Sequence, residues 1–279
     1  MDLMTPKWVI EENDALWDIA PMLEAIKQQG FEHTVQQWKP FEYDDYKRVY
    51  PGEQCVIFRG SLITAQVLRR EVQWIPGVYY NVPKYTCASY YAHLGRFLLN
   101  ADYILIPYGD LHRQKAFLYR CVGDSRAVFM RPDRGDKIFT GQVVDEDQFD
   151  EAVDRFGSIW ANTAELVVVA RPKNIKFEWR FVVVEGEIVA GSRYKVDGQS
   201  SEFPGYPAGA FEFASEVAKQ YDPGDAAWVI DVCRTDNGDY RVVEIGCFSC
   251  AGLYCCDCDE VVRAVSAAAL KEWESYQCR

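Results

Sequence analysis

The sequence contains no uninterrupted run of about 18 apolar residues, the length that a membrane-spanning helix requires. It also has no repeat with a period of about 20 to 50 residues and no low-complexity tract. Basic residues are outnumbered, since the 279 residues carry 30 Lys and Arg against 42 Asp and Glu, a net charge of −12. Nucleic-acid backbones and anionic membranes are bound through basic surfaces, so this balance argues against both as partners. We expect a soluble globular protein.

Histidine is scarce, and a secretory signal is missing. His33, His93 and His112 are far apart in the sequence, and none lies in a nucleophile–base motif, so we expect capping or surface roles for them. The N-terminal residues have neither the basic segment nor the apolar stretch of a secretory signal. A cytoplasmic location is therefore expected.

Cysteine, in contrast, is plentiful and unevenly placed. Five of the ten cysteines lie between Cys247 and Cys258. In a reducing cytoplasm, cysteines are thiols or metal ligands more often than disulfides. The five do not form two CxxC pairs separated by a loop of about 12 to 20 residues, and the segment contains no His, so packing is the favoured interpretation. A zinc- or iron-binding interaction module without catalysis is the alternative.

The pattern of apolar residues divides the chain into three parts. Residues 1–88 alternate between strand and helix patterns, which predicts a small α/β lobe. Residues 89–163 form a central part with both kinds of element. In residues 164–279, strand runs separated by tight turns predict an antiparallel sheet closed by a C-terminal helix. No long linker is apparent, so we expect closely packed lobes and an α+β architecture.

The individual elements follow from the same pattern. Helices are expected over residues 15–29, 62–70, 90–99, 145–159 and 259–276. Strands are expected over residues 8–10, 34–37, 55–58, 103–107, 127–130, 137–139, 166–169, 179–184, 187–190, 228–232 and 240–245. Three places along the later strands combine charged residues with apolar ones and are candidates for chemistry.

The first candidate is the segment 129–141. A strand delivers Arg131 to a turn that contains Gly135, and the chain returns through Lys137. Such a hairpin can lay two cations and several backbone N–H groups over the oxygens of a polyphosphate. An ordinary charged hairpin tip is the alternative.

The second candidate is the segment 178–194. Strand alternation puts Glu178 and Arg180 on one face, and a hairpin at residues 185–186 is expected to bring Arg193 close to Arg180. Two guanidinium groups on one sheet face need anions, and a phosphoryl group or a substrate carboxylate suits them. A Glu/Arg pair on the surface is the alternative.

The third candidate is a pair of carboxylates, Asp231 and Glu244. They lie in neighbouring antiparallel strands whose other residues are mainly apolar, so both are expected to project into one site. Oxygen ligands on rigid strands are what magnesium bound to ATP phosphates requires. Two acids among core valines need a partner, which weakens the alternative of a merely structural role.

Taken in this order, the candidates resemble the ATP-grasp superfamily, and more closely a clade of small ATP-grasp proteins found in phages and bacteria. The matching residues are 131–141, 178–180, 231–232 and 244–254, and the resemblance covers residues 50–256. It implies an ATP-grasp fold, in which ATP lies between two antiparallel-sheet subdomains that follow an N-terminal α/β lobe.

The resemblance also implies roles for individual residues. Those implied to bind ATP are Arg131, Lys137, Val167, Val169, Ala170 and Glu178, with the strand around Val167 supplying the adenine-binding hinge. Arg180 and Arg193 are implied to lie near the γ-phosphate and the acyl phosphate as catalytic residues, and Asp231 and Glu244 to hold magnesium. The implied reaction is carboxylate–amine (peptide-type) ligation through an acyl phosphate, with ATP and Mg²⁺ as cofactors and a small molecule or peptide as substrate.

One position departs from the family pattern. Many ATP-grasp proteins have an Asn two residues after the second metal-binding Glu, and Gly246 stands there in this sequence. Water, Ser249 or Asp231 is a candidate to compensate. A kinase, a nucleotidyl transferase or an attenuated nucleotide-binding regulator is therefore kept as the alternative function.

The N-terminal lobe offers a weaker candidate at residues 59–61. Ser61 ends a strand and opens a helix, so an N-cap is the favoured interpretation. A site that binds an anion through backbone N–H groups is the alternative.

Overall fold

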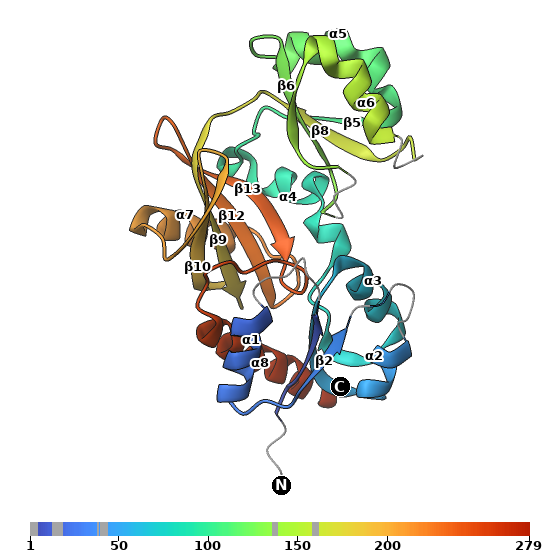
Figure 1. Cartoon of the computed structure of the whole chain (residues 1–279), viewed down its shortest axis with the longest axis vertical. Helices are drawn as coiled ribbons and strands as arrows, with labels where there is room; N and C mark the ends of the chain where they lie inside the picture. The colour runs from blue at the N-terminus through green and yellow to red at the C-terminus, as the bar shows by residue number, and fades with distance from the viewer. Residues whose placement is uncertain (1–4, 13–18, 38, 40–43, 136–138, 158–161) are drawn as a thin grey trace.

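The computed structural model describes residues 5–12, 19–37, 39, 44–135, 139–157 and 162–279. These residues form three sheets that follow one another along the long axis of the molecule, as Figure 1 shows. The N-terminal lobe lies at the bottom of that view, the sheet of the C-terminal part in the middle and the central sheet at the top. The expected α+β architecture is confirmed.

The N-terminal lobe is a parallel sheet with helices on both faces. Its strand order is β2 (His33–Gln37), β1 (Lys7–Glu12), β3 (Gln54–Arg59) and β4 (Trp74–Gly77). One face packs on α1 (Ile19–Gln28) and α8 (Cys258–Gln277), and the other on α2 (Asp44–Val49) and α3 (Leu62–Glu71). Cover on both faces explains why β3 is apolar at successive positions instead of alternating.

The central sheet is antiparallel and has helices on one face. Its strand order is β5 (Ile104–Pro107), β8 (Leu166–Ala170), β6 (Ala127–Pro132) and β7 (Gln142–Asp145). The helices α5 (Leu111–Val122) and α6 (Phe149–Gly157) pack on it around a core of their own. The strand β8 pairs on both sides within this sheet, although the expected division at residue 164 placed it with the C-terminal part.

The C-terminal sheet is antiparallel and carries most of the candidate residues. Its strand order is β11 (Gln199–Pro204), β10 (Glu187–Val196), β9 (Ile175–Val184), β12 (Ala227–Thr235) and β13 (Tyr240–Cys247). The helix α7 (Ala208–Gln220) contacts one face together with α4 (Cys87–Leu94), and α8 contacts β9 and β10 as well as β3 and β4. The helix α8 thus joins this sheet to the N-terminal lobe.

Short 3-10 helices complete the described elements. They are η1 (Val82–Tyr85), η2 (Gly95–Phe97), η3 (Tyr108–Asp110) and η4 (Glu146–Gln148). None of the helices in the described ranges is both long and apolar enough to cross a membrane.

The structure corrects some expected elements. The helix expected over residues 90–99 begins earlier and ends at Leu94, because Gly95 takes a φ of +37° that does not continue a helix. The helix expected over residues 145–159 is η4 followed by α6 in the described part. Of the strand expected over residues 137–139, residues 137 and 138 lie outside the described residues, and β7 begins only at Gln142. The helices α5 and α7 were not predicted.

Candidate active site

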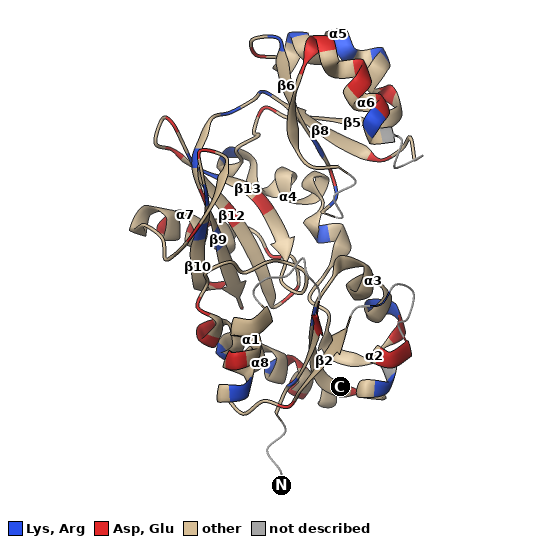
Figure 2. Cartoon of the chain, viewed as in Figure 1, with Lys and Arg blue, Asp and Glu red and all other residues tan. Residues whose placement is uncertain are grey.

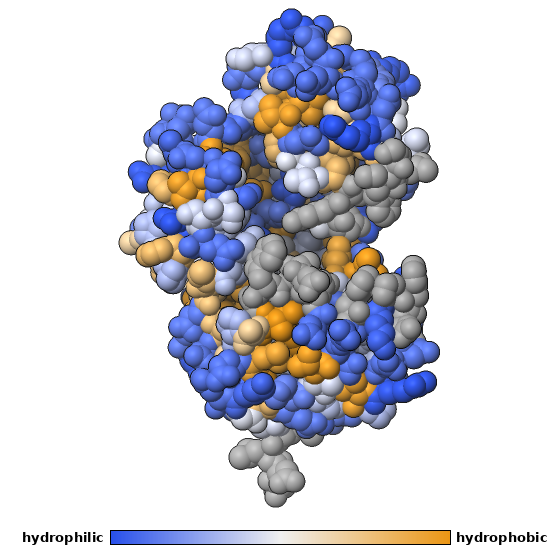
Figure 3. Space-filling model, in the orientation of Figure 1, coloured by the Kyte–Doolittle hydropathy of each residue, from blue (hydrophilic) through white to orange (hydrophobic). Residues whose placement is uncertain are grey.

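The candidate residues gather at a cleft between the central and C-terminal sheets. The cleft has a volume of about 420 Å³, within the range of small-molecule sites. Arg131 and Arg134 line it on the central side, and Glu178, Lys195 and Glu244 line it on the C-terminal side. Figure 2 shows charged residues of both signs within the strands of the C-terminal sheet, and Figure 3 shows a hollow with a hydrophilic surface between the two parts.

Arg180 and Asp231 form a bidentate ion pair across β9 and β12. The two residues are directly opposite in the register, with Nε–Oδ1 and Nη2–Oδ2 distances of 2.7 Å each. The third donor, Nη1, reaches the carbonyl oxygen of Gly252 at 2.8 Å. Burial opposes the charge of the guanidinium, but Asp231 outweighs it and holds the pKa of Arg180 well above its ordinary value. A buried carboxylate is tolerated here because a planar donor fork satisfies both of its oxygens.

Glu244 lies opposite Asp231 in the register, as the sequence predicted. Its carboxylate is 3.1 Å from the Nη2 atom of Arg131, which reaches across from β6 in the central sheet. The register shifts after Asp231, so that Val243 is an extra residue on β13, and its carbonyl oxygen accepts a hydrogen bond from Arg131 Nη1 at 3.2 Å. Arg131 therefore ties the two walls of the cleft together.

Tyr194 and Lys195 join the site although the sequence argument did not select them. The hydroxyl of Tyr194 donates to Glu178 Oε2 at 2.7 Å and lies 3.3 Å from Asp231 Oδ2. Lys195 Nζ is 3.5 Å from Glu178 Oε1. The register of β10 shifts between Arg193 and Lys195, and this bulge turns both Tyr194 and Lys195 toward Glu178.

The expectation that Arg193 approaches Arg180 is wrong. An extra residue, Val189, shifts the register of the hairpin, so that Ser192 pairs with Arg180 and Arg193 pairs with Trp179. A shift by one residue moves a side chain to the other face of a sheet. The Arg193 guanidinium lies on that face, where it donates to Ser201 and stacks 5.2 Å from the Phe203 ring.

The strand that was expected to supply the adenine hinge is interior to the central sheet. Val167, Val169 and Ala170 pair with β5 or β6 and are buried, and none of them lines the cleft. Lys173 and Ile175, which follow this strand, do line it. Burial lowers the pKa of Lys173, against the effect of its ion pair with Asp102.

Lys137 lies outside the described residues, and its predicted contact with phosphate stays a prediction. Ser249, a candidate to compensate for Gly246, is engaged elsewhere. Its buried hydroxyl donates to the Phe58 carbonyl oxygen at 2.8 Å and accepts from the Tyr79 N–H at 3.0 Å. A Cβ atom at position 246 would lie 3.0 Å from a methyl group of Val229, so the strand packing favours glycine there.

The carboxylates fit a magnesium ion that is bound together with phosphates. Among the described residues, no three His, Cys, Asp or Glu side chains gather so as to hold a metal ion by themselves. Magnesium in nucleotide sites takes one or two carboxylates and completes its shell with phosphate oxygens and water. Glu244 lines the cleft, and Asp231 keeps lone pairs that Arg180 does not use, because a carboxylate has about four acceptor positions.

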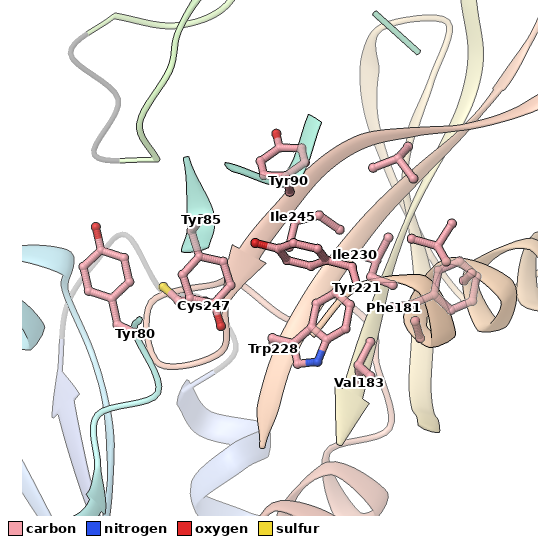
Figure 4. Close-up of a cluster of buried hydrophobic side chains, with 14 of the residues drawn as sticks. Tyr80, Tyr85, Tyr90, Phe181, Val183, Tyr221, Trp228, Ile230, Ile245 and Cys247 are labelled. Atoms are coloured by element: carbon pink, nitrogen blue, oxygen red, sulfur yellow. The ribbon is translucent and has the colours of Figure 1, made fainter. Parts of the chain in front are cut away.

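The cysteine-rich segment packs into the fold. Cys247, Cys256 and Cys258 are buried in hydrophobic clusters, and all ten cysteines are free thiols. Figure 4 shows Cys247 among the buried aromatic side chains at the end of β13, with Tyr85 beside it. Within the described residues there is no cluster of metal ligands here, which agrees with the packing interpretation.

Ser61 caps α3, as the sequence favoured. Its hydroxyl accepts from the Thr64 N–H at 3.3 Å. The Ser61 N–H itself donates to Glu11 Oε1 at 2.9 Å, so a carboxylate of the chain already sits at this helix end. The structure therefore does not favour an anion site there.

Comparisons with known proteins agree with this geometry. A family model described as an ATP-grasp domain, the third family of its clade, matches residues 64–265. A comparison with curated proteins gave no match.

Solved structures resemble the fold of the whole chain. D-alanine–D-alanine ligase from Bacillus anthracis has a TM-score of 0.63 at 10% identity, covering 98% of this chain and 100% of that one. D-cycloserine synthetase DcsG has a TM-score of 0.60 at 13% identity, covering 94% and 99%. ATP-grasp ligase PsnB, complexed with a precursor variant, Mg and ADP, has a TM-score of 0.60 at 14% identity, covering 96% and 100%. Because the family match spans most of the sequence and the fold agrees, the chain belongs to the ATP-grasp superfamily, in the clade family that this model describes.

Proposed function

We propose that the chain is an ATP- and magnesium-dependent carboxylate–amine ligase. The observation that carries this proposal is the cleft in which Arg131 reaches from the central sheet to Glu244, beside Asp231. Its walls supply cations for a polyphosphate and carboxylates for a divalent cation. Membership of the ATP-grasp superfamily and the likeness to solved ATP-grasp ligases support the same function.

In the proposed reaction a substrate carboxylate oxygen attacks the γ-phosphorus of ATP, and the bond to the β,γ-bridging oxygen breaks to release ADP. An amine nitrogen then attacks the acyl carbon, inorganic phosphate leaves, and the nitrogen loses a proton. Magnesium, when bound, supplies charge neutralisation on the phosphate oxygens. Arg131, Lys173 and Lys195 bind and orient the phosphates, and Glu244 with Asp231 holds the cation.

Arg180 acts in this proposal as a positioning residue. Its guanidinium is held by Asp231 and by the Gly252 carbonyl oxygen, so it fixes the carboxylate more directly than it meets a phosphate. Arg193 keeps its catalytic role only as a prediction, because its side chain lies on the other face. Lys137 and the segment from Val167 to Ala170 are proposed to contact the nucleotide through the turn and the hinge that adjoin them.

The substrates are proposed to be a carboxylate and an amine carried by small molecules or peptides, with no nucleic acid or membrane as partner and a cytoplasmic location. The complex of PsnB with a precursor peptide and AMPPNP supports a peptide, and D-alanine–D-alanine ligase supports an amino acid. The proposed division is residues 1–88, 89–163 and 164–279, with β8 contributing to the central sheet.

Gly246 favours a second candidate. Without a side-chain ligand at this position, a kinase, a nucleotidyl transferase or an attenuated nucleotide-binding regulator fits the same cleft. Analysis of the product separates these. A ligase or kinase releases ADP and a nucleotidyl transferase does not, and only the ligase requires an amine.

The first experiment is a thermal-shift titration with ATP and magnesium. Wild type is expected to gain melting temperature with ligand concentration, and Arg131→Ala and Glu244→Gln to gain much less. Arg126→Ala is the matched control, because Arg126 pairs with Glu146 and Asp147 on the exposed face of the central part. Absence of any shift at millimolar ATP would contradict the proposal.

A further inference from the structure

The carboxylates of Glu178 and Asp231 approach the same tyrosine hydroxyl from two strands. Glu178 lines the cleft, whereas Asp231 is buried behind it under Arg180. Tyr194 lies between them, with its hydroxyl 2.7 Å from Glu178 and 3.3 Å from Asp231. Among the described residues it links the carboxylate that faces the nucleotide side to the carboxylate assigned to the cation.

The hydroxyl is held in place on all sides. Tyr194 is 5% exposed, and its ring stacks on Tyr254 with centroids 4.8 Å apart and planes 8° apart. Burial, together with the negative charges of Asp231 and Glu178, raises the pKa of Tyr194 well above its ordinary value, so the hydroxyl keeps its proton. That proton lies between two carboxylates that would otherwise repel each other at short range.

The other contacts of the two acids do not replace this link. Lys195 reaches Glu178 alone, at 3.5 Å, and its side chain is 43% exposed. Arg180 reaches Asp231 alone. Each acid thus has its own cation, and the Tyr194 hydroxyl is the shared contact.

We propose that Tyr194 is a positioning residue that fixes the Glu178 and Asp231 carboxylates relative to each other and so couples nucleotide binding to binding of the divalent cation. This inference rests on the proposed function, in which Asp231 and Glu244 hold magnesium. It predicts that loss of the hydroxyl lowers the advantage that magnesium gives to ATP binding, and leaves binding of metal-free ATP almost unchanged.

The test is titration calorimetry of Tyr194→Phe with ATP, once with excess magnesium and once with EDTA. The quantity compared is the ratio of the Kd in EDTA to the Kd in magnesium. This ratio is expected to fall about tenfold, as loss of one hydrogen bond to a charged group would give, while the Kd in EDTA changes less than about twofold. Phenylalanine keeps the ring stack, so the variant is expected to fold.

The matched control is Tyr79→Phe. Tyr79 is buried and donates to the Glu272 carboxylate at 2.8 Å in the N-terminal lobe, so this variant loses a similar hydrogen bond far from the cleft. Its ratio is expected to equal that of wild type. A parallel fall in both variants would overturn the proposal, because the effect would then be one of general stability.

Further outcomes separate this inference from the proposed function. An unchanged ratio in folded Tyr194→Phe, or an equal loss of affinity with and without magnesium, overturns the inference alone. Wild type that binds ATP equally well in both conditions, or not at all, overturns the proposed function and this inference with it. If Tyr194→Phe does not fold, Glu178→Gln carries the test, since it weakens the same contact from the other end; an unchanged ratio there also overturns the inference.

Discussion

The side chains of Arg180 and Asp231 show how a site of this kind is held together residue by residue. Both are largely buried, at 12% and 5% side-chain exposure, and each satisfies the other through two hydrogen bonds. A buried ion pair adds little net stability, but removal of one partner leaves an uncompensated charge. The pair therefore matters more for the position of the carboxylate than for its own energy.

Arg180→Met is expected to lower the free energy of unfolding by about 3 to 5 kcal/mol, because it leaves the Asp231 carboxylate buried without its cation. Arg180→Met/Asp231→Leu is expected to regain most of that loss, since no charge is then stranded. Urea unfolding of the two variants measures this. A loss below about 1 kcal/mol in the single variant would show that the carboxylate is less buried than the structure indicates.

At the scale of elements, the sequence predicted strands well and their register poorly. Apolar runs located β9, β12 and β13, and the opposition of Asp231 and Glu244 followed from the turn between their strands. The bulges at Val189 and between Arg193 and Lys195 were not predictable, because no local pattern marks an extra residue. Each bulge reverses the faces that simple alternation assigns, so the sequence selected Arg193 where the structure places Tyr194 and Lys195.

The helix α7 was missed for a related reason. Its sequence carries small residues on the face that packs, with Ala210, Ala214 and Ala218 buried, so the apolar stripe is weak. Lys173 was missed because it lies in a connection between two sheets, where no periodicity applies. Position relative to the cleft comes from the packing of whole elements, which a single sequence does not display.

The loop between α7 and β12 offers a prediction about pH. Asp225 in this loop accepts hydrogen bonds from Asn81 N–H and Tyr85 Oη, and burial raises the pKa of Asp225 to about 6 from 3.8. A carboxyl whose pKa is raised on folding favours the folded state most at low pH, and this contribution is lost as the pH rises from about 4 to above 6.

Wild type should therefore lose, relative to Asp225→Asn, at most about 3 kcal/mol of unfolding free energy between pH 4 and pH 7. Asparagine keeps the acceptor oxygen for Asn81 and Tyr85 and does not titrate, so the difference between the two proteins isolates Asp225. Urea denaturation at several pH values measures it. A difference that does not change with pH would contradict the assignment.

At the scale of the whole molecule, the hydrophobic cores divide the chain unequally. One core combines α1 and α8 with strands of both the N-terminal and the C-terminal sheets. The central sheet instead packs with α5 and α6 around a separate core. The N-terminal lobe and the C-terminal sheet therefore share their packing, whereas the central part is joined to them mainly through the cleft.

We expect two cooperative units in hydrogen exchange at low denaturant. Amides of β5 to β8 should exchange as one group, and those of β1, β3, β9 and β12 as another of higher stability. ATP with magnesium should slow exchange in the central group most, because it bridges that group to the more stable one. A single exchange unit across all three sheets would contradict this division.

The central claim is that the cleft between the two antiparallel sheets binds ATP with magnesium. A crystal structure with a non-hydrolysable ATP analogue and magnesium tests it most directly. The account predicts phosphates beside Arg131 and a metal ion between Glu244 and Asp231, with Tyr194 still on Glu178. A nucleotide bound elsewhere on the molecule, or phosphates that leave both carboxylates without a metal, would contradict it.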